Sequence, residues 1–327
     1  MSKAAQIARQ YPISSFFALA FGFSWGLWLV FQPLYMAGRP ASSGTFGAWA
    51  APLLMLGIFG PALAAITLSA IAGPGRREGT RKAALIAFAL AWPAGTLLFT
   101  LDQVSGEGRE FSLFIGALSA VAALLPAFVL AQSLHSTPGV RRCLETIARP
   151  RGALRWHVLA LLGFPCLWGL GLLLTRALGM PAPAVRMPQA GTVLQAFFYT
   201  LLFTGLSEEP GWRGFALPRL QARLSPLAAS LVLGAFWALW HAPARLGGFE
   251  ARSLADMLVE FVLIILLSIL FTWLYNRAGR SILAAMLLHT SMNTATRFMA
   301  ITIGGLALLA LFLAFIVARD RMWEKRA

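Results

Sequence analysis

Ionisable and polar side chains gather at three points in the second half of the chain, inside otherwise apolar runs. The first is the segment from Glu208 to Arg213 (EEPGWR), the second ends at His241, and the third begins at His289 and ends at Asn293. Titratable groups inside a membrane are costly, and where they persist they usually carry function. Carboxylate, imidazole and amide groups together can activate a water molecule and stabilise an oxyanion, which is the chemistry of amide hydrolysis.

Spacing within the motifs predicts how these side chains lie on their helices. Glu209 precedes Arg213 by four residues, which is the favourable order for a helical ion pair. His289 and Asn293 are also four residues apart and share one helical face. The Pro-Gly pair after the two acids predicts a kink, because proline removes a backbone hydrogen bond and glycine is conformationally permissive. Trp237 and Trp240 are interpreted as packing or interface aromatics.

The chain that carries these motifs has the composition of a membrane protein. Of its 327 residues, 58% are hydrophobic and 12% are charged, whereas a soluble domain has roughly 25% charged residues. Its mean hydropathy is +0.72. The net charge of +15 does not indicate nucleic-acid binding, because no basic module interleaved with aromatics is visible. Cys143 and Cys166 predict neither a disulfide framework nor a metal-binding pair.

Apolar runs long enough to span a membrane, roughly 20 residues each, predict an all-α polytopic transmembrane helix bundle. About ten runs are present, at residues 13–36, 50–72, 83–101, 111–134, 157–178, 193–220, 227–244, 254–275, 282–298 and 303–318. The last two are short and closely spaced, so we expect eight to ten spans. We divide the chain into N-terminal helices (1–190), a core with the three motifs (191–300), and a last helix with a basic tail (301–327).

The loops between these runs predict the orientation of the bundle. When the loops are assigned alternately to two sides, 20 of the 27 basic residues fall on the side of both termini. Basic residues concentrate in cytoplasmic loops. We therefore expect both termini in the cytoplasm, and an integral multi-pass protein of a bacterial cell (inner) membrane.

Depth along the helices allows the three motifs to meet. With a rise of about 1.5 Å per residue, Glu208, His241 and His289 fall within one layer of an apolar core about 30 Å thick. We expect them to converge on one water-filled cavity that opens toward the cytoplasmic side, with Asn293 one turn from His289.

The order EExxxR, aromatic-xxx-His, HxxxN resembles the signature of the CAAX-protease and bacteriocin-processing (Abi, Rce1-like) family of intramembrane endopeptidases. The matching residues, in motif order, are Glu208, Glu209, Arg213, His241, His289 and Asn293. Trp237 departs from the pattern, because the family has phenylalanine four residues before the second-motif histidine. The resemblance covers about residues 195–300. It implies that the protein, in contact with membrane lipid, cleaves membrane-associated or lipidated proteins or peptides. Some relatives trim prenylated proteins, and others process bacteriocins or confer immunity to them.

Two mechanisms are compatible with these residue types. In the first, Glu208 and His241 activate a water molecule, while His289 and Asn293 face the developing oxyanion. In this mechanism, Arg213 keeps the carboxylate of Glu209 ionised. In the second, a zinc ion binds Glu208, His241 and His289, with water as the fourth ligand.

Two other function classes stay open. A proton-coupled transporter also uses buried Glu and His; however, transporters often break helices at corresponding positions in both halves, and the first half has no counterpart of Glu208-Glu209. A non-catalytic immunity or scaffold protein would keep the fold without hydrolysis. The motif HExxH of zinc proteases does not occur. The segment Gly205-Leu206-Ser207-Glu208-Glu209 beside the acids fails the GxSxG pattern of serine hydrolases at its last position. No oligomeric state follows from the sequence.

Overall fold

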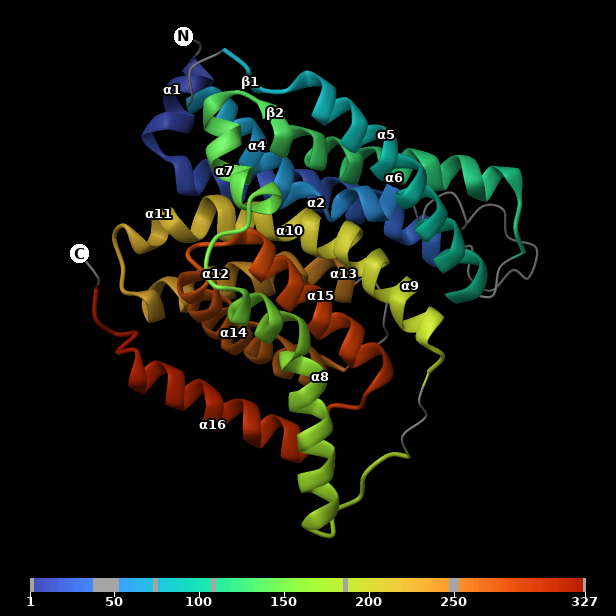
Figure 1. The fold of residues 1–327 in the computed structure, drawn as a ribbon, viewed down its shortest axis with the longest axis vertical. Helices are drawn as coiled ribbons and strands as arrows, with labels where there is room; N and C mark the ends of the chain where they lie inside the picture. The colour runs from blue at the N-terminus through green and yellow to red at the C-terminus, as the bar shows by residue number, and fades with distance from the viewer. Residues whose placement is uncertain are drawn as a thin grey trace.

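The computed structural model describes residues 3–37, 53–72, 76–106, 110–184, 188–246 and 253–325, which form a bundle of α-helices (Figure 1). Within these residues, seven helices are long and apolar enough to cross a membrane. Five of them are α2 (Pro12–Ala37), α5 (Arg81–Leu101), α6 (Leu113–Leu134), α8 (Leu154–Ala177) and α14 (Leu254–Arg277). The sixth, Pro226–Leu246, consists of α12 (Pro226–Trp240) and α13 (Ala242–Leu246). The seventh is a continuous helical rod, Ala190–Gln221.

Three shorter helices account for the remaining predicted runs. They are α4 (Gly60–Ala72), α15 (Ile282–Phe298) and α16 (Ile303–Arg319), with 13, 17 and 17 residues. All ten predicted runs therefore contain a helix. Seven of them reach the usual length of a span, and α15 and α16 lie at its lower limit of about 17 residues. The protein is an integral, multi-pass, all-α membrane protein.

Helix starts in the second half are set by local capping. The hydroxyl of Ser225 accepts the N–H of the third helical residue of α12, and Ser281 and Thr302 cap α15 and α16 in the same way. Ser253 and Asp256 form a reciprocal capping box at the start of α14. Such caps satisfy backbone N–H groups that have no partner within the helix. They place the helix starts close to the boundaries that hydropathy predicts.

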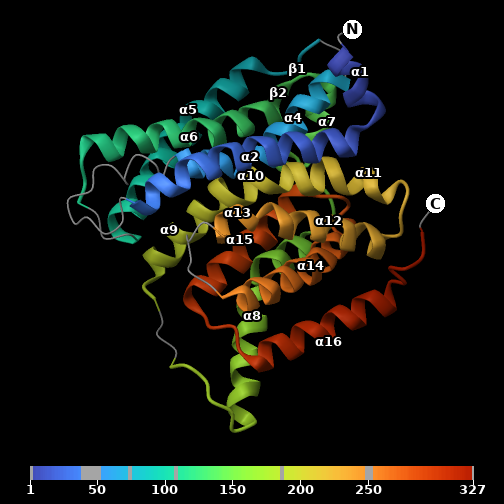
Figure 2. The ribbon, with the colours of Figure 1, turned by 180° about the vertical axis from the view of Figure 1, so that it is seen from behind.

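The remaining described elements are short. They are α1 (Lys3–Gln10), α7 (Pro138–Ala148), and two strands, β1 (Glu78–Gly79) and β2 (His135–Ser136). The strands pair antiparallel, a small departure from a purely helical chain. Figure 2 shows α5 and α6 side by side at one edge of the molecule, with α8 and α16 at the other end.

Contacts between distant segments collect one set of helix ends at a single face, which we call the basic face. Arg9 donates to the carbonyl of Ile71 at the end of α4, and β1 pairs with β2. Thr146 of α7 accepts the backbone N–H of Ile282 at 2.9 Å. The N–H of Leu227 donates to the carbonyl of Met322 in the C-terminal segment. The basic face thus includes the end of α1, the ends of α4, α14, α16 and the rod Ala190–Gln221, and the starts of α12 and α15.

A second set of contacts defines the opposite, distal face. Arg297 at the end of α15 pairs with Asp102 after α5, at 3.2 Å. Arg245 of α13 pairs with Glu260 near the start of α14. These pairs join the other ends of the same helices. They place the segments after α5, α12 and α15 near one face, as the alternation of connecting segments predicts.

Candidate active site

The rod Ala190–Gln221 carries the two acids at a local change of helical winding. It consists of α9 (Ala190–Thr200), a π-helical turn η2 (Leu201–Gly205), α10 (Leu206–Glu209), a second π-helical turn η3 (Pro210–Ala216), and α11 (Leu217–Gln221). Proline cannot donate the backbone bond of a regular α-helix. The rod therefore widens around the acids and continues, where the sequence predicts a kink. Wide turns of this kind are frequent at functional sites.

Gly211 lets another helix approach this segment closely. A Cβ atom at Gly211 would lie 2.5 Å from backbone atoms of Pro61 in α4. Any side chain would therefore push α4 away from the acids. The glycine provides room for packing, whereas the sequence interpretation assigned it conformational freedom.

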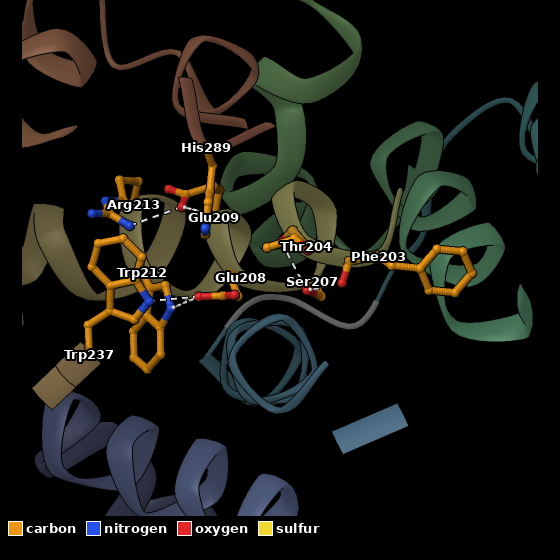
Figure 3. A network of polar contacts seen from close by, with 9 residues as sticks. All are labelled: Phe203, Thr204, Ser207, Glu208, Glu209, Trp212, Arg213, Trp237 and His289. Carbon is orange, nitrogen blue, oxygen red and sulfur yellow. Dashed lines mark hydrogen bonds and ion pairs between the residues drawn. The ribbon is translucent and has the colours of Figure 1, made fainter. Parts of the chain in front are cut away.

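Glu208 is buried and accepts two indole N–H groups on one oxygen (Figure 3). Trp212 donates to Oε2 at 3.1 Å from the next turn of the same rod. Trp237 donates to the same oxygen at 2.7 Å from α12. Because an indole nitrogen only donates, both contacts position the carboxylate. Oε2 is thus occupied, and Oε1 is the oxygen through which Glu208 can act on another molecule.

The sequence interpretation did not identify this role for the two tryptophans. Trp212 follows Glu208 by four residues, a spacing that places both on one helical face and could have indicated the contact. Trp237 was assigned to packing, although it occupies the aromatic position of the second motif. Its neighbour Phe236 is 37% exposed and stacks on Phe17 of α2.

Glu209 joins the first and third motifs. Its Oε1 accepts from Arg213 Nη1 at 3.0 Å and from His289 Nδ1 at 2.8 Å. The predicted ion pair is therefore confirmed, while its extension to His289 was not foreseen. A carboxylate only accepts, so His289 donates through Nδ1. In the neutral ring this leaves Nε2 with a lone pair.

Arg213 is completely buried between two aromatic rings. Its guanidinium carbon lies 4.5 Å from the ring centroid of Trp237 and 4.3 Å from that of Phe271 in α14. Arg213 Nε and Nη2, and Glu209 Oε2, have no hydrogen-bond partner among the described residues. The aromatic faces compensate part of this loss, because ring quadrupoles attract a cation.

His241 lies just beyond α12, and its tautomer is defined by its contact. Its Nδ1 is 2.8 Å from the carbonyl oxygen of Trp237. A carbonyl cannot donate, so Nδ1 carries the proton and the neutral ring has its lone pair on Nε2. The segment is supported from the first half of the chain, since Trp25 of α2 donates to the carbonyl of Trp240.

A cavity of about 830 Å³ brings the predicted site residues together. Glu208, His241, His289 and Asn293 all line it, whereas Glu209 and Arg213 lie behind it and are fully buried. The predicted convergence on one cavity is therefore present, with Asn293 one turn along α15 from His289.

The cavity extends from Glu208 and His289 toward the distal face. Its charged lining there comes from Arg245, Asp256, Glu260 and Arg297. The two termini belong to the opposite, basic face. The prediction that the cavity opens on the side of the termini is therefore wrong, because helix rotation and tilt, which hydropathy does not report, direct the cavity the other way.

The same side chains are the ones that would hold a zinc ion. Across the described ranges, no three His, Cys, Asp or Glu residues are grouped so that they could hold a metal ion, and this includes Glu208, His241 and His289. The hydrogen bonds of this set to protein groups leave Nε2 of both histidines and Oε1 of Glu208 free, so they do not themselves oppose a metal. It is the spacing of the three side chains, as they stand, that does not fit a zinc site.

Comparison with known proteins agrees with the motif pattern. The sequence profile of the family described as Type II CAAX prenyl endopeptidase Rce1-like matches residues 190–295. The CAAX prenyl protease 2 of Methanococcus maripaludis is 34% identical over 110 residues, which is 32% of this chain and 41% of the relative. The chain thus covers less than half of that relative's length. Residues 190–295, which the family profile matches, contain all three motifs. Residues 190–295 of the chain are therefore similar to the Type II CAAX prenyl endopeptidase Rce1-like family.

Proposed function

We propose that the protein is an intramembrane endopeptidase that hydrolyses peptide bonds with a water molecule activated by Glu208. The observation that supports this most directly is the setting of Glu208. Two indole donors hold one carboxylate oxygen, and the residue lines a cavity that also reaches His241, His289 and Asn293. A general base needs such positioning, because geometry sets the efficiency of proton transfer before acidity does.

The proposed reaction assigns one task to each group. Glu208 Oε1 takes a proton from water as the water oxygen attacks the peptide carbonyl carbon, and His241 Nε2 orients the same water. The carbonyl oxygen becomes an oxyanion that Asn293 stabilises through its amide N–H. Glu208 then transfers the proton to the departing amine as the C–N bond breaks.

His289 faces the same oxyanion as Asn293. Its Nδ1–H remains on Glu209, which fixes the direction in which the Nε2 edge of the ring points. Glu209 and Arg213 are positioning residues, because they hold this ring from behind the cavity. A carboxylate that orients an imidazole has the same task in serine hydrolases.

Substrate class and location belong to the same proposal. The substrates are membrane-associated or lipidated proteins or peptides, in keeping with the name of the archaeal relative. We place both termini in the cytoplasm and the protein in a bacterial cell membrane, because basic residues concentrate on the side of the termini.

The decisive variant is Glu208→Gln, which keeps the shape of the side chain and removes the base. Loss of a general base lowers the rate at least roughly a hundredfold. We expect that loss at normal abundance, measured as the disappearance of newly formed peptide ends in quantitative proteomics of membrane fractions. Glu145→Gln, in α7 at the basic face, is the matched control and should keep full activity. Full activity of Glu208→Gln would instead favour the non-catalytic scaffold.

The zinc mechanism has its own test. It requires a rearrangement that brings Glu208, His241 and His289 together, and it predicts that chelation abolishes cleavage and that Zn²⁺ restores it. The proposed mechanism predicts cleavage that is unaffected by chelators in protein shown to be metal-free by elemental analysis.

A further inference from the structure

Charge is distributed very unevenly between the two faces of the molecule. By sequence, the segments that connect helix ends at the basic face hold 19 basic and four acidic residues, without counting the buried Arg213. Those that connect the opposite ends hold seven basic and six acidic residues. Short loops rich in Lys and Arg stay in the cytoplasm. As proposed above, the basic face is taken as the cytoplasmic one, which places the distal face on the other side of the membrane.

The acids and imidazoles are closed off from the basic face. Toward that face, the turns after Glu209 are packed solid, with Trp212, Phe215 and Leu217 at most 1% exposed. Below His289 the same is true of α15, where Ala285 is fully buried and Met286 is 3% exposed. A substrate approaching from the cytoplasmic face would meet this packed layer before it reached Glu208.

Toward the distal face, by contrast, the lining of the cavity becomes polar and charged. Thr296 and Arg297 end α15, Asp256 and Glu260 begin α14, and Arg245 follows α12. Thr296 is exposed, and it lies seven residues beyond His289, or about 10 Å along the helix. A mouth that offers both charge signs suits a polar polypeptide segment better than a lipid tail.

We infer that the cavity is entered from the non-cytoplasmic side. The substrates are polypeptide segments that have already crossed the membrane, for example the outer end of a membrane-inserted segment or an exported peptide held at the outer surface. This inference rests on the proposed endopeptidase function for its substrate class, and on cavity direction and charge for its side of the membrane. A prenylated C-terminus in the cytoplasm would be on the wrong side.

Cysteine accessibility tests the direction of access without measuring cleavage. Three variants are made in a chain in which Cys166 is replaced by serine: Thr296→Cys at the mouth, Met292→Cys inside the cavity, and Ala222→Cys in the exposed loop of the basic face. The parent without a new cysteine reports any background from the buried Cys143. Intact and permeabilised cells are treated with a charged, membrane-impermeant thiol reagent.

The expected result is labelling of Thr296→Cys and Met292→Cys in intact cells, with Ala222→Cys labelled only after permeabilisation. The reverse pattern would overturn the inference. Labelling at the mouth with none at Met292→Cys, even in permeabilised cells, would also contradict it, because the cavity would then be closed to water. Both results are independent of catalysis. The Glu208→Gln experiment can therefore fail while the direction of access stands, and the converse also holds.

Discussion

Replacing Arg213 by alanine should destabilise the protein by roughly 3–5 kcal/mol, because it leaves the Glu209 carboxylate buried without its cation. Both side chains of the pair are 0% exposed, and the two atoms are 3.0 Å apart. The variant also loses the contacts of the guanidinium with Trp237 and Phe271. A desolvated cation over an aromatic ring contributes about 2 kcal/mol. We therefore expect a loss at the upper end of the range, and lower cellular abundance.

A second substitution separates the stranded charge from the lost packing. Glu209→Gln removes the negative charge and keeps an oxygen that His289 can donate to. The double variant Arg213→Ala/Glu209→Gln should be more stable than Arg213→Ala alone, because no uncompensated charge remains. Coupling energies between residues in contact are about 0.5–3 kcal/mol. The coupling energy, obtained by including Glu209→Gln alone as the fourth member of the cycle, should fall within that range.

Unfolding by denaturant in detergent micelles, followed by tryptophan fluorescence, measures these differences, since the chain has 11 tryptophans. The matched control is Arg151→Ala. Its pair with Glu145 has the same 3.0 Å separation, but the two side chains are 56% and 30% exposed. Exposed pairs contribute at most about 1 kcal/mol. The reasoning fails if Arg213→Ala costs no more than Arg151→Ala, or if the double variant is less stable than Arg213→Ala.

Three further outcomes follow from other contacts. Trp237→Phe keeps an aromatic side chain but removes the N–H that Glu208 accepts at 2.7 Å. A hydrogen bond to a charged group contributes about 1.5–3 kcal/mol, so kcat/KM of the folded variant should fall roughly tenfold or more. Unaltered kinetics would show that Trp212 alone suffices. Gly211→Ala should cost about 1–3 kcal/mol of unfolding free energy through overpacking. The control Gly22→Ala, which has nothing within 4 Å of its added Cβ, should not destabilise the protein. Equal effects of the two substitutions would contradict the close approach of α4 to Gly211. Burial raises the pKa of the Cys143 thiol in α7 from 9.0 to about 11. The stability that this pKa shift contributes is complete below pH 9 and is lost as the pH rises toward 11. The unfolding free energy should therefore fall more steeply at alkaline pH than in Cys143→Ala, and identical pH profiles would contradict this.

Much of the fold could be predicted from the sequence because the bilayer restricts what a spanning segment can be. Backbone groups in lipid must be satisfied within the segment, so a long apolar run becomes a helix. All ten predicted runs contain a helix for this reason. The pair Glu209–Arg213 was predictable on similar grounds, since both residues belong to one helix and the spacing alone brings them together.

Contacts between different helices were decided only by the tertiary structure. Trp237 reaches Glu208 from 29 residues away, and His289 reaches Glu209 from 80 residues away. Such contacts depend on the rotation of each helix about its axis and on its tilt. Hydropathy carries little information about either, because apolar side chains surround these helices on every side. The direction of the cavity depends on the same two quantities. The sequence could therefore identify the chemical groups and their depth, while packing determined their partners and the face on which the cavity opens.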